Sequence, residues 1–213
     1  DCARLRVELG AIYETQGDFI MAESTYQQSL QYWEKIGDSM WQATLYNNLG
    51  VLQHAKGDLE DSFYSLEKAM DYAKLSGNRR MEGYSLASIG DLYRSLDALD
   101  EALEAYANAM KIAQDIEDQY LILYIRLAES HIRVLQRGFK QADTLLELAF
   151  NQARKSKSEF EIRQCDLEKA LYTYFAGDIS TAVIMLSPLE DYFIESGQNE
   201  LIFTVEAYLA VAL

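Results

Sequence analysis

The residues best suited to acid–base or metal chemistry are two histidines, His54 and His131, and two cysteines, Cys2 and Cys165. The histidines lie 77 residues apart, and no His-x-x-x-His or Cys-x-x-Cys pairing places two ligands together. The fold would therefore have to assemble any metal site or nucleophile–base pair from distant residues. The sequence predicts no metal, no cofactor and no catalytic residue, and it favours partly buried or surface-lining roles for both histidines.

Carboxylates are the other source of chemistry, because two of them can serve as the general acid and base of a hydrolase. They gather at the predicted starts of second helices, for example at Glu60 and Asp61 and at Asp100 and Glu101. Negative charge at a helix start is stabilised by the helix dipole, which accounts for this pattern without catalysis. There is no Gly-x-x-x-x-Gly-Lys-Ser/Thr loop and no Gly-x-Ser-x-Gly elbow. The sequence predicts that the protein is not an enzyme, with an unrecognised hydrolase as the weaker alternative.

The charge balance limits the partners. There are 19 Lys and Arg against 34 Asp and Glu, a formal net charge of -15. This excess would repel nucleic acid and anionic membranes, so neither is predicted to bind directly. The apolar stretches 121–125 and 207–213 fall far short of the roughly 20 residues that a membrane span needs. Two widely separated cysteines and no secretory signal predict a cytoplasmic protein.

The elements that must position any site are helices. A single proline, Pro188, leaves few helix breakers, and Pro188 itself is expected to kink or split its helix. Small residues recur every 40 positions in two columns, the second lying twelve residues after the first. The first column is Gly10, Gly50, Gly90, Ser130, Ala170 and Ala210, and the second is Ala22, Ser62, Ala102, Ala142 and Ala182. Turn formers such as Gly17-Asp18 and Gly37-Asp38 fall between the columns and between the repeats, which predicts one antiparallel helix hairpin per repeat.

This pattern resembles the tetratricopeptide repeat. Its motif is partly met by Leu49-Gly50 with Ala69, and more fully by Ile89-Gly90, Tyr93, Ala102, Tyr106 and Ala109. The unit is 40 residues long rather than the usual 34, as in the longer repeats of this family. The resemblance implies an all-α fold, a right-handed α-α superhelix built as a solenoid of antiparallel hairpins with a concave groove.

The predicted organisation is one repeat domain over residues 1–213. The repeats are expected at about 3–40, 41–80, 81–120, 121–160 and 161–198, followed by the first helix of a sixth repeat at 199–213. An apolar last helix without a polar cap leads us to expect a piece of a longer protein, with self-association through uncapped ends as a further possibility.

In the tetratricopeptide family, recurring positions of each first helix face the groove and bind a peptide or protein. On this sequence the resemblance implies a candidate groove formed by Thr44, Asn47, Asn48, His54, Tyr84, Ser88, Asp91, Arg94, Tyr124 and His131. Amides and tyrosines are good peptide readers, because an amide pairs with backbone groups and tyrosine offers contact area at low entropic cost. Asn48 is the leading candidate, since an asparagine at this position holds the ligand backbone in relatives. The open alternative is that Asn48 only links neighbouring helices.

One ligand class is disfavoured by this mapping. The chaperone-tail clamp of the family uses two asparagines and several basic residues, whereas here only Asn48 fits, and Val7, Ala11, Tyr84 and Ser88 occupy matching positions. The segments 46–52 and 85–94 resemble repeat regions of bacterial regulators of the MalT and SARP kind. That resemblance implies the sensor or partner-binding arm of a bacterial transcription regulator that binds a protein, a peptide or a small inducer. A general assembly scaffold is the alternative.

Overall fold

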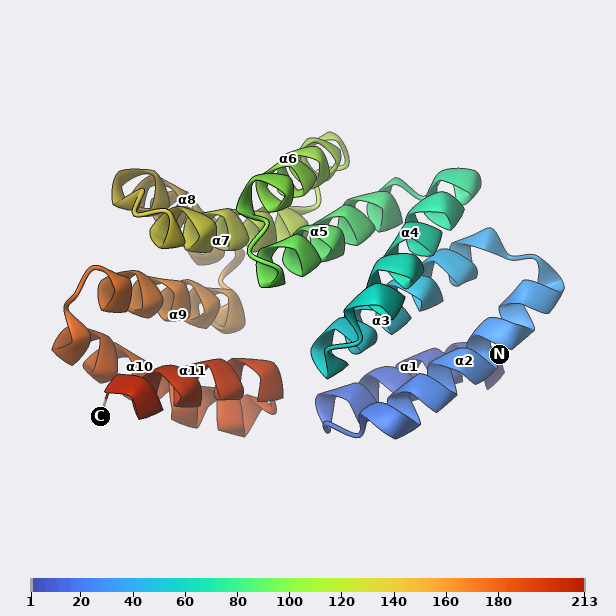
Figure 1. Ribbon diagram of the computed structural model, residues 1–213, viewed down its shortest axis with the longest axis horizontal. Helices are drawn as coiled ribbons and strands as arrows, with labels where there is room; N and C mark the ends of the chain where they lie inside the picture. Colours follow the sequence, from blue (N-terminus) through green and yellow to red (C-terminus); the bar gives the residue numbers. More distant parts are fainter. Residues whose placement is uncertain (1, 213) are drawn as a thin grey trace. The chain divides into compact units, whose positions relative to one another are not determined.

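The computed structural model describes residues 2–212, without the side chain of Glu200; Asp1 and Leu213, at the ends of the predicted domain, lie outside the described residues. Helices make up almost all of this part of the chain, and no strand occurs in it. They are α1 (Cys2–Thr15), α2 (Phe19–Ile36), α3 (Ser39–Lys56), α4 (Leu59–Ser76), α5 (Arg79–Ser95), α6 (Leu99–Asp115), α7 (Gln119–Leu135), α8 (Phe139–Ser156), α9 (Glu159–Phe175), α10 (Ile179–Ser196) and α11 (Asn199–Ala212). The predicted all-α fold of antiparallel helix hairpins is confirmed (Figure 1).

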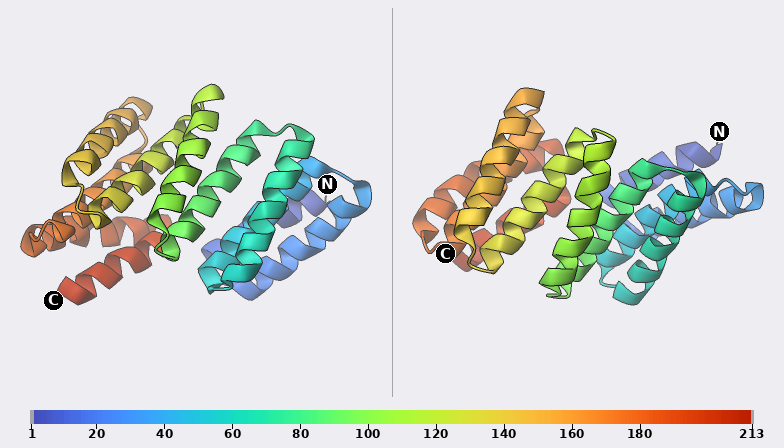
Figure 2. Two further views of the ribbon diagram at one scale, coloured as in Figure 1. Left: turned by 45° about the horizontal axis from the view of Figure 1, so that its top comes forward. Right: turned by 90° about the horizontal axis from the view of Figure 1, so that it is seen from above.

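The chain divides into two compact units, an N-terminal unit, Asp1–Ile122, and a C-terminal unit, Leu123–Leu213, with the boundary inside α7. In each unit the hairpins follow one another in sequence order, as the views in Figure 2 show. The core of the N-terminal unit includes Tyr26 and Leu30 of α2 packed with Leu45, Leu49 and Leu52 of α3. The C-terminal unit has its own apolar cluster, formed by Leu167, Leu171, Leu186, Leu189, Phe193 and Val205.

Helix ends follow the turn chemistry of the sequence. Asp18, Asp38, Asn78 and Asp178 each precede a helix and accept a backbone N–H from its first turn. The residue directly before each of these capping residues, such as Gly17 before Asp18, has a left-handed backbone with positive φ. Glycine adopts this conformation most easily. Four equivalent turn positions carry other residues at positive φ, and they are Asp97, Glu117, Arg137 and Lys157. The same turn is therefore built at these four positions with backbone strain.

Replacing Asp97 or Glu117 by glycine is expected to raise the free energy of unfolding by ~0.5–1 kcal/mol each, because a left-handed non-glycine residue is strained by more than glycine loses in entropy. Both residues have positive φ, 58° and 55°. Thermal or urea unfolding followed by helical circular dichroism measures the change. Gly57→Ala is the matched control: its added Cβ meets no atom within 4 Å, so only the backbone is strained. It should destabilise the fold, and a loss of stability in both glycine variants would contradict the interpretation.

The two small columns lie where the helices of a hairpin touch. Ala22, Ser62, Ala102, Ala142 and Ala182 are all completely buried. A Cβ built on Gly10 would lie 2.4 Å from the Tyr26 ring, and one on Gly90 would lie 2.6 Å from the Tyr106 ring. Such distances are shorter than carbon atoms tolerate, so these two hairpins require glycine at the contact.

Serine in either column adds a hydrogen bond across the hairpin. The hydroxyl of Ser62 on α4 donates to the carbonyl of Gly50 on α3 at 2.7 Å. In the fourth repeat the roles are exchanged, because Ser130 on α7 donates to the carbonyl of Ala142 on α8 at 3.2 Å. Both serines are buried, so the hydroxyl of each small residue has a partner inside the contact.

Pro188 does not split α10, so that part of the expectation is wrong: the helix runs without interruption from Ile179 to Ser196. The proline removes one backbone donor, and the helix still packs through Leu186, Leu189 and Phe193, all buried. Core packing on both sides of the proline therefore holds the helix together. Among the described residues, no helix is long and apolar enough to cross a membrane.

Candidate functional site

Most of the candidate groove residues lie on two neighbouring first helices of the N-terminal unit. Thr44, Asn47, Asn48 and His54 belong to α3, and Tyr84, Ser88, Asp91 and Arg94 belong to α5. Two polar bridges join these helices directly. The Ser88 hydroxyl donates to Asn47 Oδ1 at 3.4 Å, and His54 Nε2 lies 2.9 Å from Ser95 Oγ. The structure therefore brings these side chains together on one surface, which we call the α3/α5 surface.

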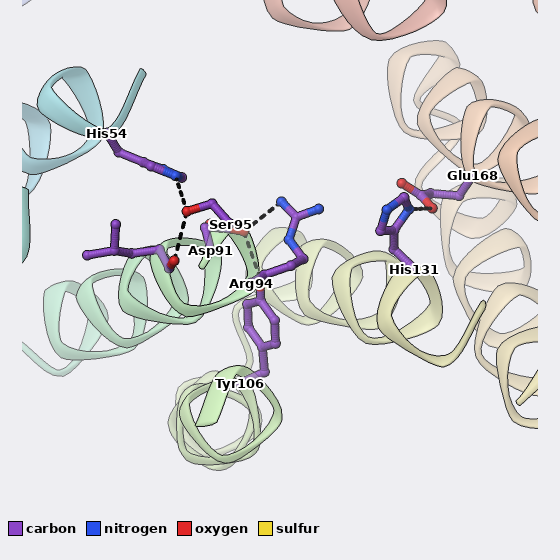
Figure 3. Close-up of polar contacts among 8 residues, drawn as sticks. His54, Asp91, Arg94, Ser95, Tyr106, His131 and Glu168 are labelled. Atoms are coloured by element: carbon purple, nitrogen blue, oxygen red, sulfur yellow. Dashed lines mark hydrogen bonds and ion pairs between the residues drawn. The ribbon is translucent and has the colours of Figure 1, made fainter. Parts of the chain in front are cut away.

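The bridge between His54 and Ser95 has the composition of a nucleophile and its base, but its geometry differs. Ser95 Oγ donates its proton to the carbonyl of Leu92 at 2.8 Å. A hydroxyl has one proton, so His54 Nε2 must carry the hydrogen that joins the two side chains. In this arrangement the imidazole is a donor to the serine rather than its base. Figure 3 shows His54 reaching from α3 towards Ser95 on α5.

A second layer supports the α3/α5 surface from the second helix of the repeat. The Tyr106 hydroxyl, on α6, donates to Asp91 Oδ1 at 2.7 Å, and Arg94 Nη2 lies 3.3 Å from the same oxygen (Figure 3). The Tyr106 ring is completely buried. This burial, together with the charge of Asp91, raises the pKa of the Tyr106 hydroxyl far above its usual value. Asp91 and Arg94 are thus held in place by the hairpin beneath them.

Asn48, the leading candidate for backbone recognition, has a structural partner. Its side chain hydrogen-bonds the hydroxyl of Tyr26 on α2, which itself donates to Glu14 Oε2 at 2.8 Å. Burial raises the pKa of Tyr26 far above its usual value, with Glu14 adding to the shift. Asn48 therefore links two helices, as the alternative interpretation of this residue expected, and a ligand-binding role for it stays a prediction.

The two other candidates in this unit have local contacts. Thr44 donates to the carbonyl of Met40, one turn earlier on α3. The Arg80 guanidinium lies over the Tyr84 ring, 5.4 Å from its centroid, and also pairs with Asp118 at 2.9 Å. The hydrogen bond with the Tyr84 hydroxyl is the main cause that raises the pKa of Arg80. The Tyr84 ring is consequently half-exposed, and the Arg80 guanidinium, which Asp118 holds in place, stacks on it.

Tyr124 and His131 lie in the C-terminal unit and are described separately from the α3/α5 surface. His131 Nδ1 lies 3.3 Å from Glu168 Oε2 on α9, and the imidazole meets the Phe175 ring edge-on at 6.3 Å (Figure 3). Tyr174 and Phe175 contact Tyr208 of α11 in turn. Tyr124 is half-buried on α7. Within the C-terminal unit, the structure therefore pairs His131 with an acid and with an aromatic ring.

Sequence reasoning did not assign a role in the site to three residues that support it, the tyrosine donors Tyr26 and Tyr106 and the cation Arg80; Tyr106 was identified only as a motif residue. The sequence does contain a signal for the two tyrosines. They lie sixteen residues after Gly10 and Gly90, at a repeat position that is leucine in the other repeats. Among the described residues, no group of three His, Cys, Asp or Glu side chains could hold a metal ion. Cys165 is buried, and burial raises its thiol pKa to about 12.

Two family models match parts of the chain. Residues 1–74 match the tetratricopeptide repeat, and residues 49–136 match anaphase-promoting complex subunit 5. The chain has the tetratricopeptide-repeat fold. No curated protein matches the sequence. The resemblance to MalT- and SARP-type regulators stays a prediction.

Solved tetratricopeptide-like structures align with nearly the whole chain. A Rap protein complexed with competence and sporulation factor has a TM-score of 0.75 at 13% identity, over 99% of this chain and 63% of its own. RapI in its apo form has a TM-score of 0.71 at 14% identity, over 99% of this chain and 84% of its own. A tetratricopeptide repeat protein from Parabacteroides merdae has a TM-score of 0.54 at 18% identity, over 99% of this chain and 75% of its own. This chain thus spans less than two thirds of the Rap protein in that complex, and at these identities the likeness establishes the fold.

Proposed function

We propose that the α3/α5 surface binds an extended segment of a protein partner. The observation that carries this proposal is the pair of bridges Asn47–Ser88 and His54–Ser95. They are seven residues apart along each helix, about 10.5 Å at 1.5 Å per residue, which matches roughly three residues of extended peptide. Fixed polar side chains at that spacing bind a peptide backbone with little ordering entropy.

The chemistry of the surface favours an uncharged stretch of backbone over a charged tail. Asn47, which is 9% exposed, accepts the Ser88 hydrogen with its oxygen, and its amide nitrogen carries two N–H donors of the kind that pair with peptide carbonyls. Asp91 and Arg94 neutralise each other at 3.3 Å. Tyr84 supplies a flat, half-exposed ring for an apolar side chain. Such a surface fits a segment with amides to read and one apolar or aromatic residue to stack.

The likeness to a Rap protein complexed with competence and sporulation factor supports a binding role for this fold. We further propose that this chain is the sensor or partner-binding arm of a bacterial transcription regulator, as the sequence resemblance of segments 46–52 and 85–94 implies. A general assembly scaffold is the competing role. The reading frame that encodes residues 1–213 separates them: a DNA-binding domain encoded in the same frame supports the first, and a frame that encodes only further repeats supports the second.

Peptides selected from a random library against the whole chain test the binding surface. Tyr84→Ala should weaken the selected peptides at least ~10-fold, because a tyrosine anchor at an interface commonly carries that much affinity. Fluorescence polarisation gives the dissociation constants, and circular dichroism checks the fold. Tyr64→Ala is the matched control, since Tyr64 is an exposed tyrosine of α4. Equal binding by wild type and Tyr84→Ala, or a loss confined to Tyr64→Ala, would rule out the α3/α5 surface.

A further inference from the structure

The outward side of α10 carries a row of exposed residues around the only proline of the chain. Ile184, Pro188, Asp191 and Glu195 are all exposed, and Ile184 is 73% exposed. Their spacing of four, three and four residues places them in one row along the helix, which we call the α10 row. The opposite side of α10 packs inside the C-terminal unit through Ala182, Leu186, Leu189 and Phe193. The α10 row is therefore a second face of the helix, with an apolar first half and an acidic second half.

The other repeats show that this face is open within the stack. The same four positions of α4 are Tyr64, Lys68, Asp71 and Leu75. Tyr64 and Leu75 are 57% and 72% exposed, although α4 packs against both its own first helix, α3, and the first helix of the next hairpin, α5. Exposure of the row is thus a property of the second helix in a repeat, and it does not arise because α10 is near the end of the sequence.

Pro188 lies in the middle of the α10 row, where a proline is unfavourable. It has no N–H, so the carbonyl of Ile184 does not receive the hydrogen bond that a helix normally provides from four residues later. The corresponding residues of the other second helices all have a backbone N–H, and they are Gln28, Lys68, Asn108 and Leu148. Buried residues hold α10 together, but they do not account for a proline on the outward side. A backbone acceptor next to the exposed Ile184 side chain is a place where a donor from another molecule can bind.

The charges of the α10 row select a basic partner. The corresponding rows of α4, α6 and α8 each contain a lysine, and these are Lys68, Lys111 and Lys155. The α10 row contains none, and residues 170–213 as a whole hold six Asp or Glu and no Lys, Arg or His. Asp191 and Glu195 therefore present negative charge that the neighbouring sequence does not offset. Charge complementarity favours a partner that brings positive side chains to them.

We propose that the α10 row binds a basic amphipathic helix of a partner protein. Apolar side chains of that helix cover Ile184 and Pro188, and two Lys or Arg side chains about 10 Å further along pair with Asp191 and Glu195. A polar side chain between the apolar residues donates to the Ile184 carbonyl. A helix fits this row because its own side chains recur at intervals of three and four residues. The α10 row shares no residue with the α3/α5 surface, so the two can be tested independently.

The probe is a helical peptide of about five turns, stapled because an isolated helix of that length is marginal in water. It has leucine at its fourth and eighth positions, glutamine at the seventh, and lysine at the eleventh and fifteenth, with the staple on the opposite side. Fluorescence polarisation against the whole chain should give saturable binding with a dissociation constant below roughly 100 µM. A peptide of the same composition, in which leucine and lysine alternate along that face, should bind at least ~5-fold more weakly, because it sets a lysine against Pro188 and a leucine against Asp191. Equal affinity of the two peptides, or no saturable binding of the first, overturns the proposal.

Matched substitutions locate the site. Ile184→Ser should weaken the probe at least ~5-fold, because an apolar contact is lost, and Asp191→Lys at least ~10-fold, because it repels the lysines. The controls are Tyr64→Ser and Asp71→Lys, which make the corresponding changes at the same repeat positions of α4. They should leave the affinity unchanged, with circular dichroism as the check of the fold. An equal loss in the α4 controls would show attraction by net charge alone and overturn the proposal.

Pro188→Leu tests the carbonyl contact. Leucine keeps an apolar side chain and restores the N–H that the Ile184 carbonyl normally receives, as at Leu148 in α8. The melting temperature should therefore rise, while the affinity for the probe should fall at least ~3-fold, because the acceptor is now occupied. Unchanged affinity overturns the assignment of the carbonyl to the site. Sedimentation without peptide adds a last outcome: self-association that Ile184→Ser abolishes, together with no peptide binding, would make the α10 row a contact between copies and overturn the partner helix.

Discussion

Replacing Gly90 by alanine is expected to lower the free energy of unfolding by about 2–3 kcal/mol, the upper part of the range seen when a well-packed core is overfilled. The new methyl group would lie 2.6 Å and 2.8 Å from two ring carbons of Tyr106. That ring cannot move aside easily, because it is completely buried and its hydroxyl is held by Asp91 at 2.7 Å. Urea unfolding followed by circular dichroism measures the loss.

The same chain contains the compensating change. Glycine faces tyrosine at Gly10–Tyr26 and Gly90–Tyr106, whereas Ser130 and Ala170 occur in the repeats where the tyrosine is replaced by Leu146 and Leu186. Leu146 and Leu186 are fully buried, so a Cβ in the first column is compatible with leucine in the second helix. Tyr106→Leu should therefore lower the free energy of unfolding more in the wild-type chain than in the chain that already carries Gly90→Ala.

A double-mutant cycle makes that statement quantitative. The coupling between the two substitutions should be favourable by about 1–2 kcal/mol, within the range for residues in direct contact. Gly50→Ala is the informative comparison, since Gly50 faces Leu66 and its Cβ would lie 2.7 Å from two side-chain carbons. Its Cβ would also lie 3.3 Å from the Leu66 backbone nitrogen, but its two shortest contacts are with a leucine side chain, which adjusts its rotamer more readily than a pinned ring, so it should cost less than Gly90→Ala. Additive effects of Gly90→Ala and Tyr106→Leu would contradict direct contact as the cause.

The sequence alone predicted the helix hairpins and most of the helix ends. The two columns spaced by 40 residues identified the hairpins, and the turn residues located the helix ends, because both signals are local. Left-handed turns at Glu117 and Lys157 were recoverable only through the repeat, since neither residue favours that backbone. Pro188 misled because its local effect was judged without the core packing of α10.

The candidate site was predicted less completely, for a physical reason. The repeat register gives the face of the helix on which a residue lies, and it placed Asn47 and Ser88 on a shared surface. It does not give the partner of a long side chain, which depends on rotamers and on the distance between hairpins. The link from Asn48 to Tyr26, and that from Asp91 to Tyr106, therefore emerged only in three dimensions. Both links shift those residues towards a supporting role.

Replacing Asp91 by alanine is expected to destabilise the protein by about 2–3 kcal/mol, the loss seen when a buried donor is left without its acceptor. The Asp91 side chain is only 15% exposed, and it accepts from the Tyr106 hydroxyl and pairs with Arg94. Asp91→Asn keeps an oxygen acceptor for Tyr106 and loses only the charge, so it should cost about 1 kcal/mol. Thermal and urea unfolding of both variants measure the difference.

Tyr106→Phe separates support of the fold from contact with a ligand. If Asp91 acts by holding Tyr106, Asp91→Ala should cost at least 1 kcal/mol less in the Tyr106→Phe chain, since the buried hydroxyl is no longer there to be orphaned. A residue that contacted ligand directly would behave differently: Asp91→Asn would weaken selected peptides, while Tyr106→Phe would leave them bound. We expect the opposite result. The effects of Asp91→Ala and Tyr106→Phe on the free energy of unfolding should be strongly coupled, and Asp91→Asn should change peptide affinity little. Equal destabilisation by Asp91→Ala in both backgrounds would remove the Tyr106 link as its cause and return Asp91 to the ligand-binding candidates.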